Sequence, residues 1–205
     1  MIVTAAVWEQ AGGRVMDLQN RVKGILTNPR AEWLAIAAEP ADVAAIYRNY
    51  IAVLAAIPAI SLFLGLTIFG VPLFGRYGIA TALGSAAAMY ISSLVAPLIA
   101  AVVLEKLAPK FQSSGSTAQA LKLVAYASTP VWVAGVCYVM LMMAPLVVIA
   151  TLYAIYLLYL GMPVLMKTPY DKVVPFMVVA ALVIVVLNVV LRSIVAVFGF
   201  PTYGV

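Results

Sequence analysis

Few side chains in this sequence could carry out acid–base, metal or redox chemistry. The 205 residues include seven carboxylates, no histidine and one cysteine, Cys137, which lies in an apolar run. Histidine is the commonest general base near neutral pH and a common transition-metal ligand, so its absence argues against both kinds of site. None of the carboxylates falls in the middle of a long apolar run: Glu9, Asp17, Glu32, Glu39, Asp42, Glu105 and Asp171. We therefore expect a protein that is not an enzyme and that holds no metal and no cofactor.

Some polar side chains do lie within apolar runs: three regularly spaced tyrosines, which we call the tyrosine ladder, and an asparagine–arginine pair. Tyr153, Tyr156 and Tyr159 recur every three residues, and Asn188 lies one helical turn before Arg192. Polar groups are unfavourable inside a bilayer, so each of them needs a partner or a route to water. Arg192 could extend to the outer interface. Alternatively, it could form an intramembrane polar site with Asn188, for example for an anionic lipid headgroup.

The composition predicts which elements position these side chains. Hydrophobic residues make up 66% of the chain and charged residues 9%, and the mean hydropathy is +1.13. Soluble domains carry about a quarter charged residues, so this chain could not cover a water-facing surface. We expect an integral membrane protein. Its net charge of +5 then belongs to loops that set the topology, and no nucleic-acid partner is expected.

The apolar runs predict an all-α bundle of five membrane-spanning helices. A span needs about 20 mostly apolar residues. The uncharged stretch from Leu123 to Met166 would be roughly 66 Å long as one helix, so it must fold back, most simply at Ala144–Pro145. The predicted spans cover residues 50–70, 79–104, 122–143, 146–166 and 174–198, within a membrane domain of residues 46–200. In the third span, Ser128 and Thr129 precede Pro130 and could hydrogen-bond a carbonyl that the proline leaves free.

The basic residues predict the orientation of the bundle. With the N-terminus inside, the cytoplasmic side receives ten of them: Arg14, Arg21, Lys23, Arg30, Arg48, Lys106, Lys110, Lys122, Lys167 and Lys172. The outer side receives Arg76, with Arg192 near the end of the last span. The positive-inside rule therefore predicts a multi-pass membrane protein with a cytoplasmic N-terminus and an outer C-terminus.

Residues 1–45 are expected to form a cytoplasmic tail with two short amphipathic helices. In the first helix, Leu18, Val22, Ile25 and Leu26 share one face. Asn28 suits an N-cap and Pro29 the first position of a second helix. That second helix places Trp33, Ile36, Ala37 and Pro40 on one side and Glu32 in its first turn. The two helices either anchor the bundle at the inner leaflet or dock a partner.

If the N-terminal region docks a partner, we expect the docking surface to face the cytoplasm. Its residues come from the second N-terminal helix and from the two basic loops that follow the second and fourth spans: Glu32, Trp33, Glu39, Lys106, Lys110, Lys167, Asp171 and Lys172.

Two stretches together resemble a known family. NPRAEWLAIAAEP before the first span and YLLYLGMPVLMKTPYDK across the fourth are similar to the bacterial branch of the Yip family, the Ypt/Rab-interacting membrane proteins. The resemblance runs from about Val22 to Phe198. It implies five spans, a cytoplasmic N-terminal region and a location in a bacterial inner membrane. Eukaryotic relatives bind small prenylated GTPases in vesicle traffic, but their Asp-Leu-Tyr-Gly-Pro motif is absent from this sequence.

Two functions follow from these observations. The first is a non-enzymatic scaffold or adaptor that presents the cytoplasmic surface to a membrane or cytoplasmic protein. The second is a lipid- or small-molecule-binding or transport protein, with a cavity among the helices lined by the tyrosine ladder, Asn188 and Arg192. Membrane lipids are expected partners in either case, and small-xxx-small spacing in the second span leaves homo-oligomerisation open.

Overall fold

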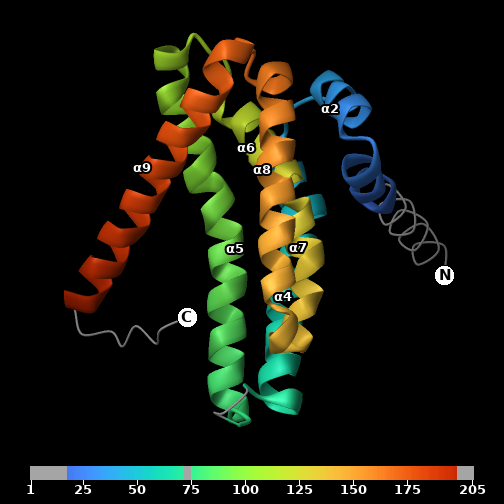
Figure 1. The fold of residues 1–205 in the computed structure, drawn as a ribbon, viewed down its shortest axis with the longest axis vertical. Helices are drawn as coiled ribbons and strands as arrows, with labels where there is room; N and C mark the ends of the chain where they lie inside the picture. Colours follow the sequence, from blue (N-terminus) through green and yellow to red (C-terminus); the bar gives the residue numbers. More distant parts are fainter. Residues whose placement is uncertain (1–17, 72–74, 198–205) are drawn as a thin grey trace, which may run out of the picture.

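Helices account for the regular secondary structure that this computed structural model describes (Figure 1). The description covers residues 18–71 and 75–197, except for the side chains of residues 187–197. Within these ranges, four helical segments are long and apolar enough to cross a membrane: Val43–Phe69, Ile79–Phe111, Thr117–Val139 and Pro145–Leu165. A further helix, α9 (Tyr170–Val197), follows where the fifth span is predicted.

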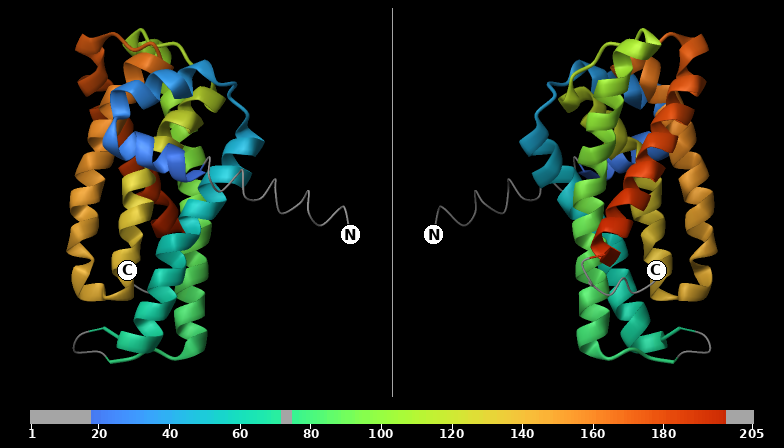
Figure 2. Two further views of the ribbon diagram at one scale, coloured as in Figure 1. Left: turned by 90° about the vertical axis from the view of Figure 1, so that its right-hand side faces the viewer. Right: turned by 90° about the vertical axis from the view of Figure 1, so that its left-hand side faces the viewer.

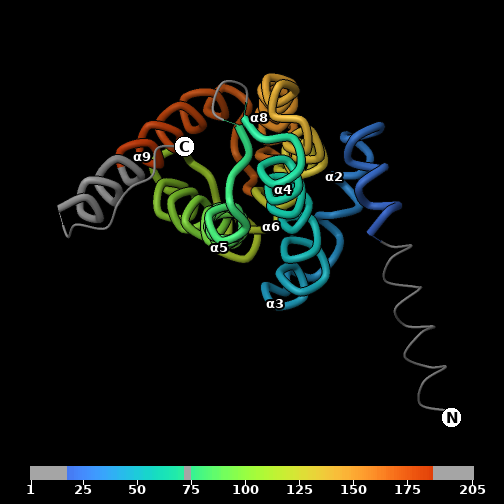
Figure 3. Tube along the Cα trace, turned by 90° about the horizontal axis from the view of Figure 1, so that it is seen from below, coloured from blue at the N-terminus to red at the C-terminus, as the bar shows by residue number. Residues whose placement is uncertain are grey.

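The N-terminal segment forms two helices that lie across the bundle rather than along it (Figure 2). The first covers residues 18–27 and the second, α2, covers Pro29–Ala38. Pro29 occupies the first turn of α2, as predicted, although the Asn28 side chain makes no capping hydrogen bond. Seen from the end of the bundle, these helices lie on the opposite side from α9 (Figure 3).

The first span begins earlier than predicted because Asp42 caps it. The Asp42 carboxylate accepts hydrogen bonds from the backbone of Ala44 and Ala45. The helix then runs without a break through four pieces: α3 (Val43–Ile46), a π-helical turn η1 (Tyr47–Ile51), α4 (Ala52–Leu64) and a second π-helical turn η2 (Gly65–Phe69). Its partner α5 (Ile79–Leu107) begins where predicted and continues to Phe111 as a 3₁₀ turn, η3 (Ala108–Phe111).

The third span is broken where Pro130 removes a backbone donor. It starts at Thr117, five residues before the predicted start, with a capping box of Ser116 and Gln119. It consists of α6 (Thr117–Ala127), α7 (Thr129–Ala134) and the 3₁₀ turns η4 (Gly135–Val139) and η5 (Leu141–Met143). Gly135 lets this span approach α4, since a Cβ there would lie 2.6 Å from the Cβ of Pro58.

The Thr129 hydroxyl repairs the break, whereas the Ser128 hydroxyl adds a bond to a carbonyl that the Ser128 N–H already reaches. Ser128 donates to the carbonyl of Val124 at 2.8 Å, and Thr129 donates to the carbonyl of Tyr126 at 2.6 Å. The Tyr126 carbonyl is the acceptor that Pro130 cannot reach because it has no N–H. The Thr129 oxygen also lies 2.6 Å from the Tyr50 hydroxyl. Because Thr129 gives its proton to Tyr126, Tyr50 donates to Thr129.

Replacing Thr129 with valine is expected to lower the free energy of unfolding by about 1–3 kcal/mol, because it leaves the Tyr50 hydroxyl and the Tyr126 carbonyl buried without partners. Thr129→Ser keeps the hydroxyl and is the matched control. Thermal unfolding of the purified full chain in detergent measures the difference. Equal stability of the valine and serine variants would show that this chain of hydrogen bonds is unimportant.

The last two helices form a hairpin that opens at its far end. The helix α8 (Pro145–Leu165) begins at the predicted proline, and α9 follows after a short connection. Figure 1 shows α9 diverging from the other helices along its length. At its near end, the ring of Phe176 stacks on Phe111 with centroids 4.8 Å apart.

The core joins the N-terminal helices to the spans. Fully buried side chains come from the helix over 18–27, α2, η1, α6, α8 and α9: Ile25, Trp33, Ile36, Ile51, Leu121, Leu123, Leu157, Met162, Val173 and Phe176. Gly161 of α8 makes room for Trp33, because a Cβ on Gly161 would lie 2.8 Å from two ring carbons of that tryptophan. The N-terminal helices are therefore packed as part of the bundle. Their polar and apolar faces are not sharply divided, since Leu34 of α2 is 65% exposed.

Candidate functional site

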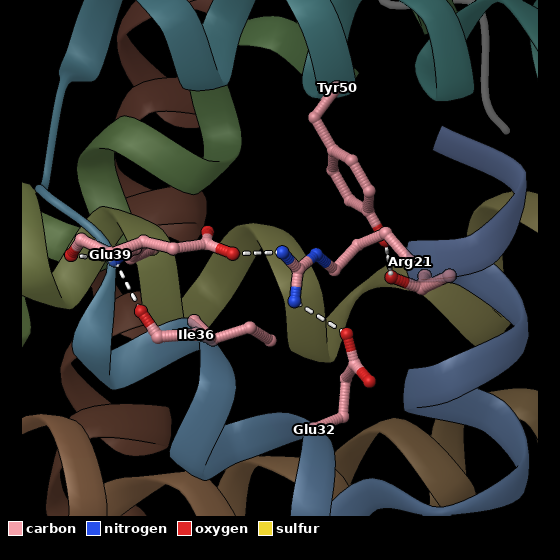
Figure 4. Close-up of polar contacts among 7 residues, drawn as sticks. Arg21, Glu32, Ile36, Glu39 and Tyr50 are labelled. Carbon is pink, nitrogen blue, oxygen red and sulfur yellow. Dashed lines mark hydrogen bonds and ion pairs between the residues drawn. The ribbon is translucent and has the colours of Figure 1, made fainter. Parts of the chain in front are cut away.

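A charged cluster lies where the N-terminal helices meet the first and third spans. Arg21 comes from the helix over 18–27, and its guanidinium lies between the carboxylates of Glu32 and Glu39 (Figure 4). Its Nη1 is 2.5 Å from the Glu32 Oε1, and its Nη2 donates to the Glu39 Oε1. The guanidinium also lies 5.7 Å from the centre of the Tyr126 ring.

The two carboxylates stabilise the charge of the partly buried arginine. Burial alone would lower the pKa of Arg21, but the negative charges of Glu39 and Glu32 outweigh it and raise that pKa above its ordinary value. Gly24, one turn after Arg21, permits this arrangement, because a Cβ there would lie 2.2 Å from the Glu32 Oε2.

A second cation, Lys122, binds the backbone at the C-terminal end of α2. The Lys122 side chain is 2% exposed, and its Nζ donates to the carbonyls of Ile36 at 2.5 Å and Glu39 at 2.6 Å. The last carbonyls of a helix lack intrahelical partners and carry partial negative charge, so a cation is favourable at this position. Lys122 therefore attaches the N-terminal helices to the third span.

A cavity of about 650 Å³ opens between these elements. Charged and polar side chains from both N-terminal helices and two spans line it, together with a few apolar ones: Leu18, Asn20, Arg21, Glu32, Glu39, Pro40, Asp42, Ala45, Ile46, Asn49, Tyr50, Lys122 and Tyr126. Tyr50 and Tyr126 pack edge to face with ring centroids 4.5 Å apart. The volume falls in the range of small-ligand sites.

The two basic loops are joined at one end of the bundle, which we call the loop end (segments 105–117 and 166–172). The Ser113 hydroxyl lies 2.8 Å from the Met166 carbonyl and 2.7 Å from the Thr168 hydroxyl, and the Ser114 N–H donates to the same Met166 carbonyl. A shallower hollow of about 460 Å³ lies here, lined by Glu105, Lys106, Ala108, Pro109, Ser113, Ser114 and Gly115.

The structure brings some predicted docking residues together and separates others. Glu32 and Glu39 meet at Arg21. Lys106, Lys110 and Lys167 are exposed at the loop end, where Lys172 lies 3.7 Å from its neighbour Asp171. Trp33 was expected on this surface, but it is fully buried against α8 and cannot contact a partner there.

The tyrosine ladder does not form one continuous surface. The Tyr153 hydroxyl donates to the Leu26 carbonyl at 2.9 Å and so holds the first N-terminal helix. Its ring lies 5.8 Å from that of Tyr156, which is exposed, while Tyr159 is partly buried beside the core. None of the three lines either cavity described above. The side chains of Asn188 and Arg192 lie outside the described part of α9.

Sequence reasoning missed Arg21 and Lys122 as site residues. It assigned both to the cytoplasmic charge that sets the topology. For Lys122 a signal was available, since the capping box at Ser116 starts the helix at Thr117 and places Lys122 inside the span. For Arg21 no local signal exists, because Glu32 and Glu39 are 11 and 18 residues away in sequence.

The four apolar helices long enough to cross a membrane define a multi-pass α-helical membrane protein. A family model, the Yip1 domain, matches residues 23–191, which is most of the chain. The protein therefore belongs to the Yip family. Comparisons with curated proteins and with solved structures give no significant match.

Proposed function

We propose that this chain is a non-enzymatic adaptor of a bacterial inner membrane, with the loop end and the N-terminal helices in the cytoplasm. The observation that carries the proposal is the connection between the two basic loops. Ser113 and Ser114 bind the backbone at Met166, so segments far apart in sequence form one surface. That surface presents Lys106, Lys110 and Lys167 to solvent.

A surface of this kind favours an acidic partner. Its lysines are exposed and project from a hydrogen-bonded framework, so a partner would not have to order the loops on binding. Like charges gathered on one face attract the opposite charge on a partner and speed up encounter. Lys172 contributes less, because the carboxylate of Asp171 lies beside it.

The N-terminal helices support this surface mainly by anchoring. Ile25, Trp33 and Ile36 point into the core, and Lys122 and Tyr153 hold the backbone of both helices. Docking by this region would use outward groups such as Glu39, whose side chain is 42% exposed.

The adaptor proposal predicts that reversing the charge of the loop end releases its partners. In Lys106→Glu/Lys110→Glu/Lys167→Glu, each lost surface pair is worth a few tenths to 1 kcal/mol, so recovery of an acidic partner should fall about ten-fold. The measurement is quantitative mass spectrometry of proteins that copurify with the full chain in native-lipid discs.

Arg76→Glu is the control, because Arg76 is exposed near the connection between the first and second spans, away from the loop end. It should leave the recovered proteins unchanged. An identical set of partners from the triple variant and the wild type would refute the adaptor function.

The lipid-binding alternative also has a specific observation in its favour. It is the cavity between the N-terminal helices and the spans, which charged, polar and apolar side chains line.

A further inference from the structure

The cavity lies at the depth of a membrane–water interface. Asp42 caps the first span, and Tyr50 lies two turns further along it. Lys122 and Tyr126 lie in the second and third turns of the third span. Both spans therefore have the cavity near their ends rather than at their midpoints. Lipid headgroups occupy this level of a membrane.

Hydrogen-bond donors on the cavity wall remain unused. Tyr126 is 8% exposed, and its hydroxyl has no hydrogen-bond partner within residues 18–71 and 75–186. Lys122 has three N–H groups, and two of them bind carbonyls of α2. Arg21 has five, and two of them bind carboxylates. Phosphate oxygens are suitable acceptors for such a group of donors, since hydrogen bonds between charged partners are the strong ones.

The same cavity also attracts a cation. Its lining carries two positive side chains, Arg21 and Lys122, and three negative ones, Glu32, Glu39 and Asp42. Glu39 and Asp42 lie at its exposed side. Each has a carboxylate oxygen that accepts no hydrogen bond from the described residues. A ligand that carried only negative charge would meet this excess of carboxylates.

We propose that the cavity binds the headgroup of an aminophospholipid, with its phosphate at Tyr126, Lys122 and Arg21 and its primary ammonium at Glu39 and Asp42. A primary ammonium has three N–H donors for these carboxylates, whereas the quaternary ammonium of a choline lipid has none. The apolar part of the wall, Leu18, Ala45 and Ile46, suits the glycerol and upper acyl region of the lipid. This inference goes beyond the adaptor function and does not depend on it.

Native mass spectrometry of the delipidated full chain tests the proposal. Phosphatidylethanolamine, phosphatidylcholine and phosphatidylglycerol with identical acyl chains are titrated separately. We expect the ethanolamine lipid to bind at least about ten-fold more tightly than the other two, the effect of one charge-assisted hydrogen bond or more. Equal affinity for all three lipids would overturn the proposal.

Tyr126→Phe removes one donor to the phosphate and keeps the ring that packs on Tyr50. It should weaken ethanolamine-lipid binding about ten-fold, whereas Tyr156→Phe, outside the cavity, should leave it unchanged. Glu39→Gln should reduce the ratio of the affinity for the ethanolamine lipid to that for the choline lipid. If Tyr126→Phe behaves like Tyr156→Phe and Glu39→Gln keeps the preference, the site is not the one described here.

A competition experiment with soluble phosphoethanolamine shows whether the site binds a membrane lipid or the free headgroup compound. We expect it to compete only at concentrations far above those of the lipid, because it lacks the part that contacts the apolar wall. Tight binding of soluble phosphoethanolamine with no binding of the lipid would overturn the assignment to a membrane lipid.

Discussion

A chain carrying Trp33→Ala is expected to lose about 3–5 kcal/mol of folding free energy, the range for removing a large buried aromatic side chain. Trp33 is fully buried in the slot beside Gly161 and Leu123, so its loss leaves a cavity between α2 and α8. The N-terminal helices should then open locally before the spans unfold. Hydrogen exchange of residues 18–38, measured in detergent together with thermal unfolding, reports both effects.

Two matched variants separate burial from other roles of this position. Leu34→Ala changes the neighbouring residue, which is 65% exposed, and should alter the free energy of unfolding by no more than about 0.5 kcal/mol. Trp33→Phe should be much milder than alanine, because Nε1 of Trp33 has no hydrogen-bond partner among the described residues. A Trp33→Ala chain with normal exchange in residues 18–38 would show that this side chain does not hold the N-terminal helices.

Lys122→Met is expected to release the C-terminal end of α2 from the third span. It removes two hydrogen bonds from a buried ammonium to the carbonyls of Ile36 and Glu39. Hydrogen bonds to charged groups contribute about 1.5–3 kcal/mol each, but methionine also avoids the burial of a charge, so we expect a net loss of about 2 kcal/mol. Faster hydrogen exchange of residues 36–42 is the specific readout.

Lys110→Met is the control for this change, since Lys110 is exposed at the loop end. It should leave exchange in residues 36–42 at the wild-type rate. If Lys122→Met also leaves that rate unchanged, the contact from Lys122 to α2 does not hold the two elements together.

The architecture could be predicted from the sequence wherever one physical effect dominates. Apolar runs of membrane-spanning length predicted helices over most of their length, although the first and third spans start earlier than predicted, and Pro145 marked the turn before α8. Ser128 and Thr129 were predicted to serve a carbonyl freed by Pro130, and the Thr129 hydroxyl does so at Tyr126. These are local effects, decided by residues within one or two turns of each other.

The candidate site could not be predicted in the same way, because its contacts join distant parts of the chain. Arg21 meets one glutamate of α2 and the glutamate that follows its end, and Lys122 binds backbone carbonyls more than 80 residues away in sequence. A carbonyl exists at every residue, so the sequence does not indicate which one a lysine will reach. Trp33 was expected on the cytoplasmic docking surface. The gap left by Gly161 on a distant helix places it inside instead.

The third span has a consequence for how the chain enters its membrane. It is the least apolar and the most buried of the four spans, and it carries a lysine near its start. Lipid alone would accept such a segment poorly, because the ammonium of Lys122 has no partner in hydrocarbon. The α4, α5 and α8 helices can insert on their own apolar character. We expect the third span to be held by the translocation machinery until α8 emerges, so that the two helices enter the bilayer as a pair.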